Sequence, residues 1–241
     1  MSAGITQDTL FAGRISCAQS RDGYRFSIDA VLLAHFAAPR PQDRVLDLGA
    51  GCGVVSLILS FRHPAISLTC LELQPALAAL IRVNIAENAL GHRIRLVEGD
   101  LRRIKTLVPV GGFDLIVCNP PYYPLGRGQR NPNNEQAAAR HELTAGLPDI
   151  ASAAAFAART KGRLAIIYPA ARGAALMAAL RAERLEPKRM QPVYPYPGAD
   201  ATLLLVEAMK GGGEELTIMP PLYIHERPDG EYTPEVAACY Q

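Results

Sequence analysis

The sequence has 241 residues, of which 49% are hydrophobic and 20% are charged, and its formal net charge is +2. This composition excludes a chain that is disordered throughout, and the small net charge argues against a protein that simply coats a polyanion. No apolar run reaches the ~18 to 20 residues of a membrane-spanning helix, and residues 1–14 lack the basic segment of a secretory signal, so we expect a cytoplasmic protein.

Metal-binding and disulfide-rich classes are also disfavoured. The five cysteines are odd in number, widely scattered and never spaced as C-x-x-C, which is typical of free thiols in a reducing compartment. The five histidines form no H-E-x-x-H motif and no cluster with cysteine. We therefore expect no metal site.

The predicted elements begin with a hairpin around Arg21-Asp22-Gly23 and a helix over 29–37. From residue 44 onward, short β-rich runs alternate with helical stretches. The predicted strands are 44–48, 66–71, 93–97, 113–118, 163–168, 188–193 and 202–208. The predicted helices are 54–60, 75–88, 147–159 and 170–184. The helix over 75–88 has Pro75 in its first turn and an apolar face that includes residues 83–85.

This alternation predicts an α/β fold, with a doubly wound, mostly parallel sheet of seven strands covered by helices on both faces. The last two strands are joined only by a proline-rich turn, so they are expected to form an antiparallel pair at one end. We divide the chain into an N-terminal cap (1–43), an α/β core (44–209), and a glycine joint with an acidic tail (210–241). The tail is expected to cover a sheet edge, with a turn at Asp229-Gly230.

A glycine-rich turn, Asp47-Leu48-Gly49-Ala50-Gly51-Cys52-Gly53, follows the first core strand. Glycines at this position let a ligand approach the backbone closely at the carboxyl end of a strand. The G-x-G-x-G spacing differs from the G-x-G-x-x-G fingerprint that binds a dinucleotide pyrophosphate. A tight turn with a purely structural purpose is the alternative.

Acidic residues end three consecutive core strands, namely Asp47, Glu72 and Asp100. In a parallel sheet these carboxylates share one edge, near the point where ligands bind. They would repel a pyrophosphate but suit a ligand with a ribose, an adenine and a positive centre, which describes S-adenosylmethionine. Solvated strand ends or helix N-caps are the alternative.

The segment Asn119-Pro120-Pro121-Tyr122 directly follows the fourth core strand. An amide-like or aromatic amine is a poor nucleophile because its lone pair is delocalised. The Asn119 side-chain oxygen and the Pro120 carbonyl offer two acceptors for its N–H groups, in a backbone that the prolines stiffen. Tyr122 offers a ring for stacking an extruded base. A Pro-Pro turn with an asparagine cap is the alternative.

Together these motifs resemble the class I S-adenosylmethionine-dependent methyltransferases, which have a Rossmann-like sheet, and more closely the bacterial tRNA1(Val) adenine-N6 methyltransferases. The resemblance extends over almost the whole chain, including residues 23–33, 139–143, 220–225 and 232–235. It implies a core of methyltransferase type, S-adenosylmethionine as methyl donor and tRNA as substrate, without metal or membrane. It implies catalytic residues Asn119, Pro120, Pro121 and Tyr122. The implied donor-binding residues are Phe26, Asp29, Asp47, Gly49, Gly51, Gly53, Glu72, Leu73, Asp100, Leu101 and Asn119.

RNA contacts are expected in the segment that follows the amine site. Residues 123–146 are rich in Gly, Pro and Asn and carry Arg127, Arg130, Arg140 and His141. Residues 161–189 are also rich in basic side chains and are a second candidate, although a solvated helix surface explains them as well.

Two other functions remain open. The N-P-P-Y motif also fits glutamine-N5 methylation of a protein such as a release factor. A non-catalytic RNA-binding protein that keeps the fold is the alternative of another class, and the intact Asn119, Asp47 and Glu72 argue against it.

Overall fold

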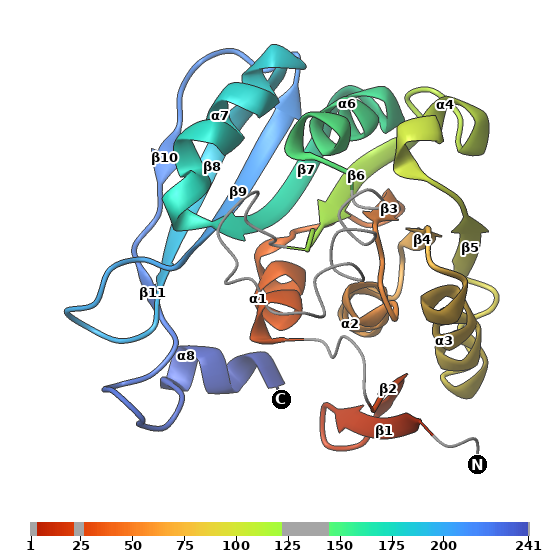
Figure 1. The fold of residues 1–241 in the computed structure, drawn as a ribbon, viewed down its shortest axis with the longest axis horizontal. Coiled ribbons are helices and arrows are strands. Elements are labelled where there is room, and N and C mark those ends of the chain that lie inside the picture. The colour runs from red at the N-terminus through yellow and green to blue at the C-terminus, as the bar shows by residue number, and fades with distance from the viewer. Residues whose placement is uncertain (1–3, 22–26, 122–144, 241) are drawn as a thin grey trace, which may run out of the picture.

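The structure is a computed structural model that describes residues 4–21, 27–121 and 145–240. Its centre is one sheet in the order β10-β8-β9-β7-β6-β3-β4-β5, with β11 also pairing with β8 (Figure 1). The main strands are β3 (Arg44–Leu48), β4 (Ser67–Glu72), β5 (Ile94–Glu98), β6 (Phe113–Cys118), β7 (Ala158–Pro169), β8 (Leu185–Tyr194) and β9 (Leu203–Lys210).

The prediction of a mostly parallel, doubly wound sheet is confirmed. β3 to β7 run parallel, whereas β9 lies antiparallel between β7 and β8. The central strands β3 and β6 are almost entirely buried, which explains why the sequence shows apolar runs there instead of alternation. The chain leaves β3 for β4 on one side and reaches β6 on the other, so the topological switch point lies at β3 and β6.

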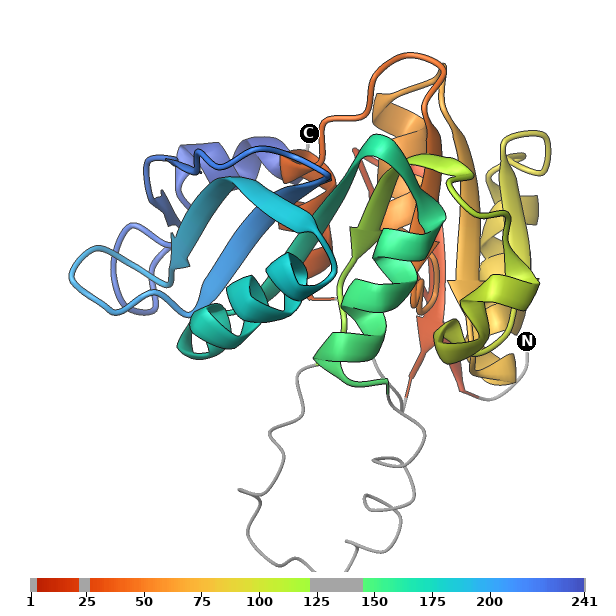
Figure 2. The ribbon, with the colours of Figure 1, turned by 90° about the horizontal axis from the view of Figure 1, so that it is seen from above.

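Helices cover both faces of the sheet. On one face lie α1 (Ile28–Phe36), α2 (Val54–Arg62) and α3 (Pro75–Glu87). On the other lie α4 (Ile104–Leu107) after the 3₁₀ turn η1 (Leu101–Arg103), α6 (Leu147–Ala157), and α7 (Gly173–Ala182) after η2 (Ala170–Arg172). Figure 2 shows α4, α6 and α7 in front of the sheet. Each face has its own cluster of buried apolar side chains.

The N-terminal hairpin differs from the prediction. β1 (Ile5–Leu10) and β2 (Ile15–Ser20) pair antiparallel, so the turn of this hairpin lies at residues 11–14. Of the predicted turn at Arg21-Asp22-Gly23, Asp22 and Gly23 lie outside the described residues. Phe11 and Ala12 both have positive φ, at 54° and 52°. The Phe11 side chain is 2% exposed and stacks on Phe61 of α2, with ring centroids 4.6 Å apart. Burial of this ring therefore overrides the local turn preference.

The tail after Gly213 pairs with the edge strand β8, as expected. β10 (Thr217–Ile218) and β11 (Leu222–Tyr223) both lie parallel to β8. His225 and Tyr232 form an antiparallel bridge around the predicted turn at Asp229-Gly230. The chain then forms α8 (Pro234–Ala237) and η3 (Ala238–Tyr240), with η3 against α1 (Figure 1).

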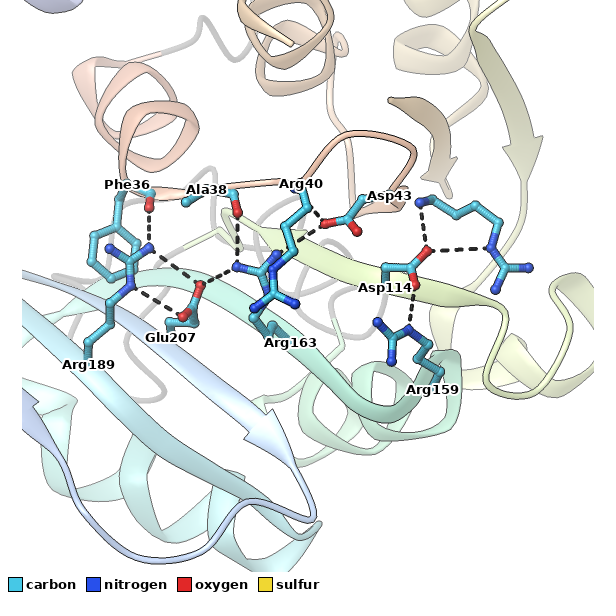
Figure 3. Close-up of polar contacts among 10 residues, drawn as sticks. Phe36, Ala38, Arg40, Asp43, Asp114, Arg159, Arg163, Arg189 and Glu207 are labelled. Atoms are coloured by element: carbon cyan, nitrogen blue, oxygen red, sulfur yellow. Dashed lines mark hydrogen bonds and ion pairs between the residues drawn. The ribbon is translucent and has the colours of Figure 1, made fainter. Parts of the chain in front are cut away.

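A buried charge network fixes the carboxyl end of α1 to the sheet (Figure 3). Arg163 on β7 forms ion pairs with Asp43 (3.1 Å) and with Glu207 of β9 (3.2 Å), and it donates to the Ala38 carbonyl (2.9 Å). Arg189 on β8 pairs with Glu207 (3.3 Å) and donates to the Phe36 carbonyl (2.6 Å). The cations thus satisfy carbonyls at the negative end of the helix dipole.

Within the described residues, none of the helices has the length and apolar character needed to cross a bilayer. Over the same ranges, no three His, Cys, Asp or Glu side chains cluster in a way that would hold a metal ion.

Candidate active site

A pocket opens at the switch point, at the carboxyl ends of β3 and β6. It is lined by Asp47 of β3, the glycine-rich turn, the start of α2, Ala30 of α1 and Asn119 after β6. The structure therefore brings together the glycine motif and the asparagine motif, which lie about seventy residues apart in the sequence. A larger groove lies at the opposite ends of the strands, where β3, β4 and β5 begin, and is lined by Arg44, Thr69 and Arg95 among others. None of the predicted site residues that the structure describes lines this groove.

The glycine turn exposes its backbone to this pocket. Gly49 and Gly51 have φ values of 77° and 61°, which L-residues with side chains rarely adopt. A Cβ added at either glycine would meet no atom of the described residues within 4 Å, so that part of the structure leaves open space beside the turn. Gly53 differs, since its Cβ would lie 3.3 Å from Ile81 of α3. Gly53 thus permits close packing, whereas Gly49 and Gly51 permit ligand approach.

Asp47 is a buried carboxylate at the floor of the pocket. Its side chain accepts a hydrogen bond of 2.7 Å from the Ser56 hydroxyl, which in turn accepts one of 3.2 Å from the Cys70 thiol. No ion pair reaches Asp47 among the residues that the structure describes. Burial raises the pKa of Asp47 to about 7, and the nearby Glu72 contributes in the same direction. The pocket therefore favours a positively charged ligand.

Glu72 fixes the glycine turn from the end of β4. Its Oε2 accepts from the Gly51 amide and its Oε1 accepts from the Gln74 amide, both at 2.8 Å. The side chain is 5% exposed, and burial raises its pKa. Each carboxylate oxygen has a further lone pair, so Glu72 retains the capacity to accept hydroxyl groups of a ligand. Leu73 follows it and is 37% exposed.

Asp100, which is expected to accept a hydrogen bond from a ligand, is already bonded within its own turn. It caps η1 through the Arg102 amide (2.9 Å), and its oxygens face the Arg102 guanidinium at 2.8 and 3.0 Å. The bonds from Arg102 lower the pKa of Asp100. Leu101 begins η1 beside it and is half-buried.

Asn119 is half-buried at the pocket wall, Pro120 is buried and Pro121 is exposed. Asp29 lies in the first turn of α1, and burial raises its pKa. Six predicted residues lie outside the described residues: Phe26, Tyr122, Arg127, Arg130, Arg140 and His141.

Comparisons with known proteins agree with this geometry. The model of the methyltransferase small domain matches residues 27–146. A tRNA1(Val) (adenine(37)-N6)-methyltransferase of Porphyromonas gingivalis is 30% identical over 200 residues, which cover 80% of this chain and 78% of the relative. The chain belongs to the methyltransferase family that includes this relative. A relative of the same name from a Flavobacteriaceae bacterium is 26% identical over 215 residues, with 89% of each chain covered.

The fold of this methyltransferase is also similar to that of a solved structure. A predicted O-methyltransferase of Agrobacterium tumefaciens has a TM-score of 0.72 and is 27% identical, with 88% of this chain and 95% of that chain covered. The predicted fold and the predicted enzyme class are therefore both confirmed.

Two buried polar residues of this methyltransferase were not predicted from the sequence, namely Ser56 and Asn84. Ser56 holds Asp47, and Asn84 of α3 holds the glycine turn through the Cys52 carbonyl. Val83, which the sequence predicts on the apolar face of α3, is 38% exposed, whereas Asn84 is 1% exposed. The buried face of α3 therefore has a polar residue at its centre. The signal was present, because Asn84 and Asn88 stand one helical turn apart and thus share a face.

Proposed function

We propose that this methyltransferase transfers a methyl group from S-adenosylmethionine to N6 of an adenine in tRNA. The observation that carries the proposal is the shared pocket of Asp47, the glycine turn and Asn119. A donor site and an amine site must adjoin for direct transfer, and the residues proposed for both line one pocket at the switch point.

The residues present fit the proposed donor. Gly49 and Gly51 leave room for close approach, while Asp47 and Glu72 supply negative charge in a buried setting. A sulfonium and an ammonium group would find their counter-charge in Asp47, and ribose hydroxyls would donate to Glu72. When bound, S-adenosylmethionine supplies a methyl group that is already activated by the sulfonium.

The proposed donor contacts also include residues of three other segments. Asp100, Leu101 and Leu73 would flank the adenine of the donor, with Arg102 sharing the Asp100 carboxylate. Asp29 would lie near the methionine end, because it precedes Ala30, which lines the pocket. Phe26 is assigned to the same region by family resemblance alone.

Asn119 and Pro120 would bind the amine that receives the methyl group. The Asn119 side-chain oxygen and the Pro120 carbonyl accept the two N–H groups and direct the nitrogen lone pair towards the donor. No group of this chain needs to remove the proton before transfer, because the methylated nitrogen becomes acidic afterwards. Tyr122 would stack on the planar base, with Pro121 stiffening the connection.

The tRNA substrate is inferred from the relatives. Those from Porphyromonas gingivalis and the Flavobacteriaceae bacterium are named as methyltransferases of adenine 37 in tRNA1(Val). Arg127, Arg130, Arg140 and His141 follow the amine site in the sequence and would contact phosphates. A tRNA-modifying enzyme of this kind would work in the cytoplasm.

Substrate class is tested by offering labelled S-adenosylmethionine with total tRNA, total protein or duplex DNA. The tRNA should come from cells that lack this enzyme. Label should enter tRNA, and nuclease digestion should release it as N6-methyladenosine. An Asn119→Ala variant is the matched control and should transfer little label.

Three results would reject the proposal. Label on protein glutamine would favour the release-factor type of activity. Label on a hydroxyl oxygen would favour a reaction like that in the name of the Agrobacterium protein. Binding of tRNA without transfer of label to any fraction would favour the non-catalytic alternative.

A further inference from the structure

Two asparagines replace a strand partner for the free edge of β2, namely Asn84 of helix α3 and Asn88 directly after the end of that helix. Asn88 accepts from the Ser16 amide (3.0 Å) and donates to the Ser16 carbonyl (2.7 Å). Asn84 accepts from the Ala18 amide (2.6 Å) and donates to the Ala18 carbonyl (3.2 Å). Each carboxamide thus mimics a peptide group, and the hairpin is bonded to α3 as if to a third strand.

Asn84 makes one contact that Asn88 does not make. Its Nδ2 also donates to the carbonyl of Cys52, at 2.9 Å. Asn84 is 1% exposed and Cys52 is 3% exposed. Cys52 stands between Gly51 and Gly53, so a single buried side chain joins the hairpin to the glycine turn.

The other hydrogen bonds of the turn are made to β4 or within the turn itself. The Gly49 and Ala50 amides donate to the Leu71 carbonyl, at 2.9 and 3.0 Å, and the Gly53 amide donates to the Ala50 carbonyl at 2.8 Å. Glu72 holds the Gly51 amide. The turn is thus fixed by β4 on one side and by Asn84 of α3 on the other.

Losing the Asn84 bond would be costly at this position. A buried carbonyl without a donor suffers the full loss of its hydration, which exceeds the net worth of an average hydrogen bond. The turn has backbone angles that need restraint from outside, because glycines have many accessible conformations. A ligand that binds only one conformation of the turn loses affinity when the others become populated.

We propose that Asn84 is a positioning residue for the methyl donor, because its carboxamide locks the glycine turn to the N-terminal hairpin. This inference rests on the proposed function, since the donor is the ligand that the turn would hold. Hairpin stability and donor affinity are then linked, and the linkage is reciprocal.

The test compares Asn84→Asp with Asn88→Asp. Both changes keep the acceptor for the hairpin amide and remove a donor, but only Asn84→Asp deprives Cys52 of its partner. We expect Asn84→Asp to weaken S-adenosylhomocysteine binding about tenfold or more in calorimetry, and Asn88→Asp to change it by less than about twofold. In activity assays, Asn84→Asp should raise the KM for the donor while kcat at saturation stays within about twofold. Equal weakening by both variants would overturn the proposal.

A second measurement uses the unchanged protein and does not depend on the folding of a variant. Amide hydrogen exchange is followed with and without S-adenosylhomocysteine. Donor product should slow exchange at Ala18, which bonds to Asn84, more than at Ser16, which bonds to Asn88. Slowing at Gly51 and Gly53 with no change at Ala18 would overturn the coupling. Failure of S-adenosylhomocysteine to bind the unchanged protein at all would instead reject the proposed function.

Discussion

The Ser56 hydroxyl donates a hydrogen bond of 2.7 Å to Oδ2 of Asp47, and both side chains are buried beneath the glycine turn. This bond favours the ionised form of Asp47, whereas burial opposes it and dominates, so that the pKa rises to about 7. The acid at the floor of the proposed donor site therefore titrates near neutral pH, so its charge can be changed by changing the pH of the experiment.

Asp47→Asn should remove a pH dependence of stability. The pKa of Asp47 is about 7 in the fold, whereas the ordinary pKa of an aspartate side chain is 3.8. Between these values the folded protein binds more protons than the unfolded chain, so this residue lowers the free energy of unfolding as pH rises through that window. From pH 4 to pH 7, the free energy of unfolding of Asp47→Asn should therefore rise relative to that of the wild type, by an amount on the order of a few kcal/mol.

Urea unfolding at several pH values measures this difference, and Asp114→Asn is the control. The pKa of Asp114 is lowered in the fold, with bonds from Arg44 and Arg159 stabilising its charged form, so its loss should have the opposite sign of effect. If the free energies of unfolding of Asp47→Asn and of the wild type differ by the same amount from pH 4 to pH 7, Asp47 does not titrate in that range.

Glu72→Ala should weaken binding of the methyl donor by about tenfold or more, because charged acceptors for the ribose and for the Gly51 amide are both lost. Glu98→Ala is the matched control. Glu98 faces Glu72 in the register of β4 and β5 but pairs with Arg82 and has a 42% exposed side chain. Calorimetry with S-adenosylhomocysteine gives both affinities, and equal values for Glu72→Ala and wild type would remove Glu72 from the site.

Asn119→Ala should reduce turnover by ~100-fold or more and leave donor affinity nearly intact. The family resemblance counts Asn119 among the donor-binding residues as well, but the acceptor that this variant loses is directed at the amine. Single-turnover methylation of tRNA measures the first quantity and calorimetry the second. Normal methylation by the variant would show that another group binds the amine.

Arg127→Ala combined with Arg130→Ala should flatten the salt dependence of tRNA binding. Two lost phosphate contacts should lower the slope of log affinity against log salt by about 1.5 to 2. Arg181→Ala combined with Arg184→Ala, at the end of α7 and just beyond it, is the control for the second basic segment. If only the control pair changes the slope, the RNA lies over residues 161–189.

Arg163→Met should destabilise the fold by about 3 to 5 kcal/mol, because it leaves Asp43 and Glu207 buried with one cation fewer. Arg159→Met on the same strand is the control, since Arg159 pairs with Asp114 near the surface and should contribute about 1 kcal/mol or less. Urea unfolding measures both. Similar losses for the two variants would show that the network in Figure 3 adds no more than a surface ion pair.

The sequence predicts the sheet because burial leaves a direct mark on composition. Buried strands such as Phe113–Cys118 need apolar residues on both faces, and that run is readable without a structure. The glycine turn and Asn119 are equally visible, because the positions where strands end follow from the strands themselves.

What the sequence leaves hidden is decided by partners distant along the chain. The hairpin turn at Phe11 depends on a ring from α2, so local turn rules place it wrongly. Asn84 looks like an ordinary helix residue until β2 and Cys52 stand beside it. The engagement of Asp100 by Arg102 is likewise a matter of side-chain orientation, which strand and helix patterns do not encode.

All five cysteine side chains are buried, Cys239 being the most exposed at 9%. Maleimide dyes react with accessible thiolates, so the folded enzyme should resist them without removal of any native thiol. A cysteine introduced at Val110, which is 70% exposed, would then be the main point of attachment. Fluorescence studies of substrate encounter can therefore begin from the natural background sequence.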